Sequence, residues 1–309
     1  MTPVGGSYRQ NLLGVWEAVP KMLALFEEYD IAATWAAVGF LFARSKQELQ
    51  EFFPLVKPIY ANTLLSPYYE SIGQSEADDP LHFAPSLIEA IRRTPRQELA
   101  THTFSHYYCL EPGQDRETFE ADLSSALAIA SKNGIQLRSI VFPRNQHNPD
   151  YDDLLIDAGI ICYRSDQSAW MYRALFATGQ RKLSRRAVEL LDAYVNLAGL
   201  HTVSWEAIQQ SNGLCNVPAS FFVRPYSPHW KRLEPTRSRR ILGSIERAAV
   251  SKEVVHLWWH PHNFGINIDQ NIDFLRAILE AFCRYRDRYG MRSMSMLDVA
   301  AAVREENVR

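Results

Sequence analysis

The sequence predicts an α/β fold, and within that class a barrel of parallel strands joined by helices. Segments with helical spacing alternate with short apolar runs along the chain, and this alternation is typical of parallel strands linked by helical crossovers. No apolar run is followed by a glycine-rich phosphate-binding fingerprint, which favours a barrel over an open doubly wound sheet. Polar clusters follow several of these runs, as they do at the carboxyl ends of barrel strands. We expect a distorted (β/α) barrel of about seven or eight units, as a single domain over residues 1–309.

Short apolar runs between turn signals indicate the strands. The expected strands and extended runs span residues 31–40, 98–101, 137–142, 160–163, 200–205, 217–224, 254–259 and 291–294.

Apolar residues at three- and four-residue spacing indicate the helices. Pro20 is expected to kink the first of them, and Gly134 is expected to end the fourth. A proline- and aromatic-rich stretch over 54–85 shows no periodicity, and loops of that length are usually functional or mobile. The expected helices span residues 9–29, 45–53, 85–94, 115–133, 151–158, 183–197, 235–250, 269–289 and 297–305.

The composition describes a folded protein without a strong charge bias. Apolar residues make up 47% of the 309 positions and charged residues 22%, so a large core can form. The formal net charge of −2 gives no reason to expect a nucleic acid or an anionic membrane as partner. The cysteines form no CxxC pair, so neither a thiolate zinc site nor a disulfide framework is indicated, and we expect reduced thiols. They are Cys109, Cys162, Cys215 and Cys283.

No targeting or membrane-spanning segment is expected. The first ten residues lack a basic stretch followed by an apolar core, and no run of about 18 apolar residues occurs. A cytoplasmic location is the simplest expectation.

A pair of histidines four residues apart is the first candidate site. His102 and His106, with Thr103, Phe104 and Ser105 between them, follow the expected strand over 98–101. On a helix this spacing places both rings on one face, and in a loop the chain can curl both rings towards one point. Either geometry suits a divalent cation such as zinc.

Three further polar clusters follow expected strands. They occupy residues 142–147, 164–170 and 256–263. Each could be structural by itself, as a surface salt bridge, a core aromatic or a satisfied histidine. Four clusters at successive strand ends together indicate a functional site.

With these clusters, the chain resembles the polysaccharide deacetylases with the NodB homology domain, carbohydrate esterase family 4. The resemblance runs from about Tyr8 to the last helix. The segment 102–106 is similar to the family's second motif, whose histidines bind the metal, and 32–42 is similar to the strand before it. The resemblance implies a distorted (β/α) barrel that uses a divalent metal, with zinc the expected ion, to remove N-acetyl or related acyl groups from sugars.

The resemblance also implies roles for other residues. Arg144 matches the arginine that steers the catalytic base, although the family's arginine precedes its proline and here Pro143 comes first. Asn145 and Gln146, in the same cluster, are expected to contact substrate.

The later motifs supply the remaining candidates. Asp166 resembles the aspartate that tunes the catalytic histidine, and it is expected to raise the pKa of His260. Trp170 resembles the tryptophan that walls the pocket. His260 resembles the histidine that acts as general acid, and His262 is an additional neighbour expected to contact substrate.

The family's first motif, a strand with two acidic residues that provide the base and a third metal ligand, has no counterpart here. The first acidic residues are Glu17 and Asp30. We therefore expect the barrel to lack its first strand and the coding sequence upstream of Met1 to encode that strand.

Two alternatives to a sugar deacetylase stay open. One is a barrel that binds a glycan or metabolite without catalysis, having lost the acidic strand. The other is an allantoinase-like amidase with a non-sugar substrate, because the sequence His260-Pro261-His262 is not specific for sugars. Trp258 and Trp259 offer faces for a sugar, but they alternate along a strand, so one of them is expected in the core.

Overall fold

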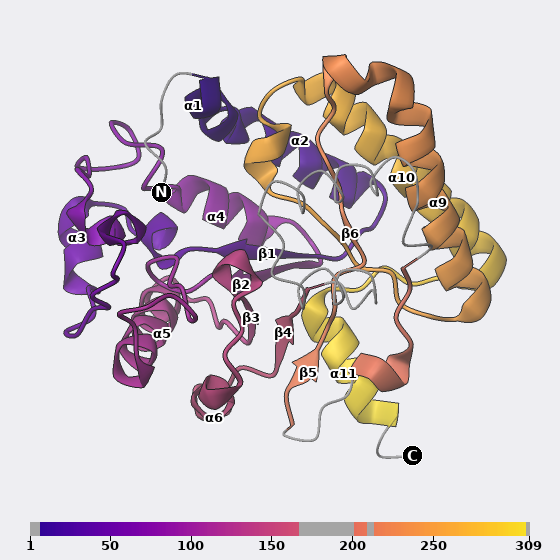
Figure 1. Ribbon diagram of the computed structural model, residues 1–309. Helices are drawn as coiled ribbons and strands as arrows, with labels where there is room; N and C mark the ends of the chain where they lie inside the picture. Colours follow the sequence, from indigo (N-terminus) through magenta and orange to yellow (C-terminus); the bar gives the residue numbers. More distant parts are fainter. Residues whose placement is uncertain (1–6, 167–200, 209–212, 307–309) are drawn as a thin grey trace.

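The computed structural model describes residues 7–166, 201–208 and 213–306 (Figure 1). Five parallel strands form one sheet in the order β1-β2-β3-β4-β5, and β6 and β7 form a separate parallel pair. The predicted α/β class with a parallel sheet is confirmed. Within the part of the chain described, the two sheets are separate ladders, so closure into a barrel stays a prediction. The strands are β1 (Ala33–Ala37), β2 (Gln97–Thr101), β3 (Ser139–Val141), β4 (Cys162–Arg164), β5 (Cys215–Asn216), β6 (Phe221–Phe222) and β7 (Leu257–Trp258).

Helices connect the strands and cover the sheet (Figure 1). Helix α4 packs on β2 and α2, α10 packs on α2 and α9, and α11 packs on β4. The predicted helix over 183–197 lies outside the described residues. The helices are α1 (Ser7–Leu13), α2 (Val15–Glu28), α3 (Lys46–Glu51), α4 (Pro85–Arg93), α5 (Arg116–Lys132), α6 (Asp152–Asp157), α9 (Glu234–Ser251), α10 (Ile268–Tyr289) and α11 (Met296–Glu306).

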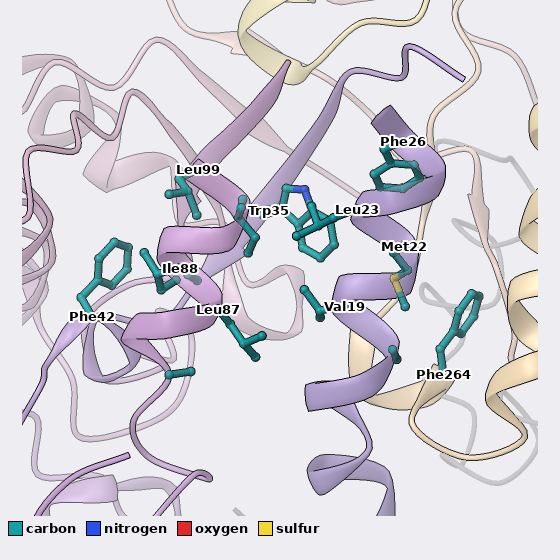
Figure 2. Packing of buried hydrophobic residues seen from close by; sticks show 14 of the residues in the cluster. Val19, Met22, Leu23, Phe26, Trp35, Phe42, Leu87, Ile88, Leu99 and Phe264 are labelled. Atoms are coloured by element: carbon teal, nitrogen blue, oxygen red, sulfur yellow. The ribbon is translucent and has the colours of Figure 1, made fainter. Parts of the chain in front are cut away.

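The main core lies between α2, α4 and the first two strands (Figure 2). Helix α2 contributes side chains at helical spacing, and α4 and β1 face them from the other side. Burying each such aliphatic or aromatic side chain contributes roughly 1.5–3 kcal/mol, which fixes the helices on the sheet that carries the site. The labelled members are Val19, Met22, Leu23, Phe26, Trp35, Phe42, Leu87, Ile88, Leu99 and Phe264.

The first helical segment breaks at Gly14 and not at Pro20, which lies inside α2. Pro20 therefore does not split the helix, and a kink there stays a prediction. A Cβ on Gly14 would lie 1.9 Å from the carbonyl oxygen of Gly265, so only a glycine permits the two backbones to meet there. This close approach packs the start of α2 on the short 3₁₀ turn Pro261–Phe264, which follows β7.

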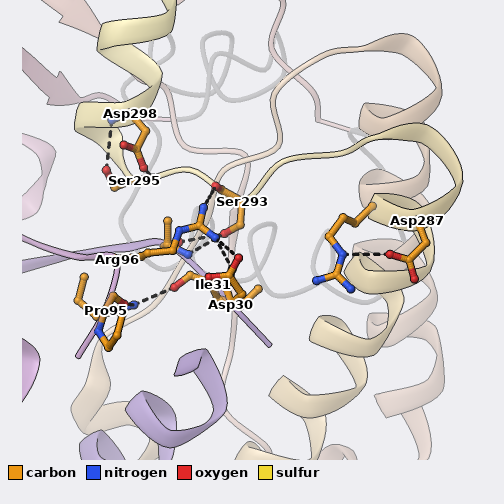
Figure 3. Close-up of polar contacts among 11 residues, drawn as sticks. Asp30, Ile31, Pro95, Arg96, Asp287, Ser293, Ser295 and Asp298 are labelled. Carbon is orange, nitrogen blue, oxygen red and sulfur yellow. Dashed lines mark hydrogen bonds and ion pairs between the residues drawn. The ribbon is translucent and has the colours of Figure 1, made fainter. Parts of the chain in front are cut away.

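The amino ends of β1 and β2 are tied to the segment before α11 (Figure 3). Arg96 donates to the carboxylate of Asp30 at 2.6 Å and to the carbonyl of Ser293 at 2.8 Å. The Ser293 hydroxyl lies 2.9 Å from the amide of Ala32, which donates to it. The predicted strand over 291–294 is therefore wrong, because side chains, and not a strand ladder, satisfy its polar groups.

The structure also bears on the predicted strand over 200–205, on the cysteines and on membrane spans. Residues 201–205 contribute only an isolated antiparallel bridge, Val203 with Val254, and not the predicted strand. All four cysteines lie outside disulfides in the structure, and Cys109, Cys162 and Cys215 are buried. Among the described helices, none combines the length and the apolar character needed to span a bilayer.

Candidate active site

The carboxyl ends of neighbouring parallel strands bring three of the polar clusters together. His102 follows β2, Asn145 follows β3, and Arg164 ends β4. Since these strands are adjacent and parallel, their carboxyl ends share one edge of the sheet. The fourth cluster follows β7, and its His260 is close enough to affect the titration of His102. The predicted convergence at the strand ends is thus present in the structure.

The turn that carries the histidine pair is held by a buried carboxylate. Asp122 of α5 accepts hydrogen bonds from the amides of Phe104 (2.7 Å) and Ser105 (3.1 Å) and from the Ser105 hydroxyl. Thr103 and His106 have φ of 66° and 59°, a left-handed conformation that non-glycine residues adopt only when their surroundings enforce it. The Asp122 carboxylate therefore fixes a strained turn.

The two imidazoles face each other with a fixed tautomer at His102. Their ring centroids are 4.8 Å apart and the planes make an angle of 74°. The Nδ1 atom of His102 lies 2.6 Å from the Val141 carbonyl oxygen, and because a carbonyl can only accept, Nδ1 carries the hydrogen and Nε2 keeps its lone pair. The Nδ1 atom of His106 is buried and has no hydrogen-bond partner.

This geometry fits part of a divalent metal site. Two imidazoles whose nitrogens lie about 2 Å from one tetrahedral ion have ring centroids roughly 5 Å apart. Burial holds the pKa of His102 well below its usual value, and the nearby His106 lowers it further. Burial and then the charge of Arg144 lower the pKa of His106 to about 4. Both rings are therefore neutral at pH 7, the form that binds metals.

A complete set of three ligands is not found in the described segments. No group of three histidine, cysteine or acidic side chains there could hold an ion. Three carboxylates of the surrounding segments are engaged with other groups: Asp122 with the turn, Glu111 with Arg144, and Asp166 with Asn145. Two imidazoles are thus the ligands that this part of the chain offers.

His260 and His262 form a stacked pair at the end of β7. Their centroids are 5.0 Å apart and their planes are 13° from parallel. The hydroxyl of Tyr8 lies 2.9 Å from Nε2 of His262, and the ring of Trp258 lies 5.4 Å from that of His260. The stacked pair is therefore anchored to α1 on one side and to β7 on the other.

The expected effect of Asp166 on His260 is wrong. The pKa of His260 is lowered to about 4, mainly because the ring is partly removed from water, although some of the side chain stays exposed. Three basic neighbours, His262, Arg164 and His106, lower it further. Asp166 instead accepts a hydrogen bond from the side-chain amide of Asn145, so its charge acts on the cluster after β3 and β4.

Arg144, Asn145 and Gln146 divide between two environments. Arg144 donates to Glu111 at 3.0 Å and lies over the Tyr108 ring, 4.5 Å from its centroid. Gln146 donates to the same carboxylate at 3.1 Å and accepts from the Leu110 amide at 3.2 Å. Asn145 alone points towards β4, where its oxygen accepts from Arg164 at 2.8 Å.

Trp170, the predicted pocket wall, lies outside the described residues. Of the other two candidates for a sugar-stacking face, Trp259 packs on Phe264 with 5.7 Å between centroids and joins the main core. The prediction that one of the pair is a core residue is thus confirmed. Trp258 lies under the guanidinium of Arg164, at 4.2 Å.

The sequence predictions assigned no role to Arg164, Asp122, Tyr8 or His256. The His256 Nδ1 lies 3.2 Å from the carbonyl of Val217, and burial lowers its pKa to about 4. Arg164 was visible only as part of a polar cluster. Asp122 had no signal, because an aspartate inside a helix is usually solvent-exposed.

A cavity of about 530 Å³ lies elsewhere, at the amino ends of the strands. It is lined by the start of β2 and the residues before β2 and β3, and by the segment that leads into the first turn of α11, including Arg96 and Ser293. In barrels the chemistry takes place at the opposite face, so we do not assign the histidine cluster to this cavity.

No protein-family model matches the sequence, and no curated protein matches it either. Among solved structures, the chain is similar to a Mycobacterium smegmatis protein considered a polysaccharide deacetylase, with 14% identity, 95% of this chain and 79% of that chain covered, and a TM-score of 0.58. A family 4 carbohydrate esterase from Streptomyces lividans, solved in complex with acetate, aligns at 10% identity over 86% of this chain and 82% of that one, but its TM-score of 0.39 supports no argument. At this level of identity the first similarity shows the fold, and the chain shares the α/β fold of the Mycobacterium smegmatis protein.

Proposed function

We propose that this chain is a metal-dependent hydrolase that removes an N-acetyl or similar acyl group from an amino sugar of a surface polysaccharide or its precursor. The observation that carries the proposal is the histidine pair, two neutral imidazoles 4.8 Å apart with the Nε2 lone pair of His102 free. The shared α/β fold of the Mycobacterium smegmatis protein supports it. A closed barrel and a cytoplasmic location belong to the same proposal.

His102 and His106 would hold the divalent ion, with zinc the expected metal. When bound, such an ion polarises the acyl carbonyl and makes water more acidic. The Val141 carbonyl keeps the His102 ring in its binding tautomer. Asp122 keeps His106 in place because it accepts hydrogen bonds from the turn between His102 and His106.

His260 would move the proton. With a pKa near 4 its ring is neutral at pH 7, so it begins the reaction as a base and accepts the proton that the attacking water loses. The same ring then returns this proton to the sugar nitrogen as the C–N bond breaks, which makes it the general acid of the second step. Each such proton transfer typically contributes about 10²–10⁴ to the rate.

Metal binding and hydrolysis are tested separately. The protein is stripped with a chelator and titrated with Zn²⁺ by calorimetry, and acetate release from N-acetylated amino sugars is then measured. We expect near-stoichiometric binding and zinc-dependent acetate release. His260→Ala should lower turnover by about 10² or more with metal binding intact. The exposed His229 provides the control His229→Ala, and equal losses in both variants would contradict the assignment.

One observation favours a second candidate, a barrel that binds a sugar without hydrolysing it. The carboxylates near the rings in the described part are engaged with other groups. This candidate is accepted if the protein binds zinc and a sugar but releases no acetate.

A further inference from the structure

Arg164 lies among the histidines and forms no ion pair with any carboxylate of the described residues. It ends β4, and its guanidinium carbon lies 4.2 Å from the centroid of the Trp258 ring. One terminal nitrogen donates to the side-chain oxygen of Asn145 at 2.8 Å. The Nε atom is inaccessible to water and has no hydrogen-bond partner. The guanidinium is therefore positioned by an aromatic face and an amide, with part of its donor edge unused.

The groups around Arg164 compensate its charge only in part. Its neighbours include His102, His256 and His260, whose imidazoles carry no negative charge. Asp166 is the carboxylate that acts on Arg164, but burial outweighs it and lowers the pKa of the guanidinium to about 10. A cation in such a place is costly unless an anion joins it.

More exposed arginines of this chain do have such partners. Arg96 lies 2.6 Å from Asp30, Arg144 lies 3.0 Å from Glu111, and Arg116 is paired with Asp153. In the described segments Arg164 has no ion pair at all, although it is less exposed than these three. The site thus presents a planar fork of donors, which matches a carboxylate or a phosphate.

We propose that Arg164 binds an anionic group of the substrate, so that the preferred substrate is an N-acylated sugar carrying a carboxylate or a phosphate near the acyl amide. This inference rests on the proposed function, because it names the substrate class of the same site. Asn145 and Trp258 act as positioning residues: Asn145 holds one end of the fork, and Trp258 supports its face. Asp166 holds Asn145 in turn.

Equilibrium binding tests the inference without relying on turnover. The probes are N-acetylglucosamine, N-acetylmuramic acid with a carboxylate, and N-acetylglucosamine 1-phosphate, whose phosphate is on the carbon next to the one that bears the amide. Each is measured by calorimetry with the full chain. A hydrogen-bonded charge pair contributes enough to expect roughly tenfold or greater preference for an anionic probe. Comparing the two anionic probes distinguishes carboxylate from phosphate. Arg164→Gln should remove the preference and leave the neutral probe within about twofold, and Arg164→Lys should keep part of it.

Arg138→Gln, at an exposed arginine before β3, is the matched control and should retain the preference. If Arg164→Gln fails to fold, competition in the wild-type protein decides: sulfate should displace the anionic probe and not the neutral one. Equal binding of all three probes, or a preference that survives Arg164→Gln, overturns the inference. The inference is also overturned if Arg164→Gln loses turnover on the neutral sugar while its binding of that sugar is unchanged. Arg164 would then act on the developing oxyanion. Anion preference without any acetate release would sustain the inference and refute the hydrolase.

Discussion

Two half-buried histidine environments in this protein have opposite electrostatics. In the loop before α4, Nδ1 of His82 lies 2.8 Å from the Asp79 carboxylate and its Nε2 lies 3.1 Å from the Glu70 carboxylate. Both partners can only accept, so both nitrogens carry hydrogen and the ring is a cation. The hydrogen bond to Glu70 is the largest cause of its raised pKa, and burial opposes it.

At the strand ends the partner is a carbonyl and the neighbours are basic. His102 donates to Val141, and His106 and Arg164 face it. Burial is the largest cause of the lowered pKa of His102, and no carboxylate of the described residues opposes it, so the ring is neutral. The comparison teaches that burial alone does not set the charge of a histidine. The charge of the neighbouring groups makes His82 a structural cation and His102 a potential metal ligand.

The largest expected effect is the loss of metal from the strand-end pair. His102→Ala with His106→Ala should reduce bound zinc from near-stoichiometric to background, because neutral imidazoles provide the lone pairs. Elemental analysis of the dialysed protein measures the bound zinc. His82→Gln is the control, since a protonated ring has no lone pair to offer. The comparison fails if His82→Gln removes the metal and the double variant keeps it.

A smaller effect is expected when the Asp122 carboxylate, which holds the turn between His102 and His106, is removed. Asp122→Ala leaves two amides and the Ser105 hydroxyl without an acceptor, and each unsatisfied donor costs about 1–3 kcal/mol. The free energy of unfolding in urea should fall by about 3 kcal/mol or more. Asp157→Ala, at an exposed helical site, should change it by less than about 0.5 kcal/mol. Similar values for the two variants would show that the turn does not depend on Asp122.

Replacing one carboxylate should lower the pKa of His82 and so make the ring more like the neutral ring of His102. Glu70→Gln removes the main cause of the raised pKa of His82, so that pKa should fall, as followed by NMR of the ring protons. The exposed Glu120 gives the control Glu120→Gln, with no expected change at His82. A pKa that stays raised in Glu70→Gln would assign the effect to Asp79 instead.

The smallest expected effect is a pH dependence of stability. Because the folded-state pKa of His82 is raised above 6.5, its contribution is fully present below pH 6.5 and is lost as the pH rises through the folded value. The difference in unfolding free energy between wild type and His82→Gln should therefore shrink as the pH rises above about 6.5. A difference that grows with pH has the wrong sign and would exclude a charged His82.

Local sequence signals determined the class of fold and which residues are candidates for the site. The helices α4, α5 and α10 were expected from periodicity, and the expected stop at Gly134 follows the end of α5 with φ of 71°. Such signals act over a few residues, so they can be read without the fold. The order of strand and polar cluster likewise placed the histidine pair at a strand end.

Tertiary structure decided what the sequence could not. The break at Gly14 depends on Gly265, 251 positions along the chain. The partner of Asp166, the neutral state of His260 and the contacts of the Arg164 guanidinium with Asn145 and Trp258 depend on which groups the parallel strands bring together. The physical reason is that burial and Coulomb interactions act between residues adjacent in space. Sequence spacing fixes which side chains are available, and the contacts made on folding fix their charge.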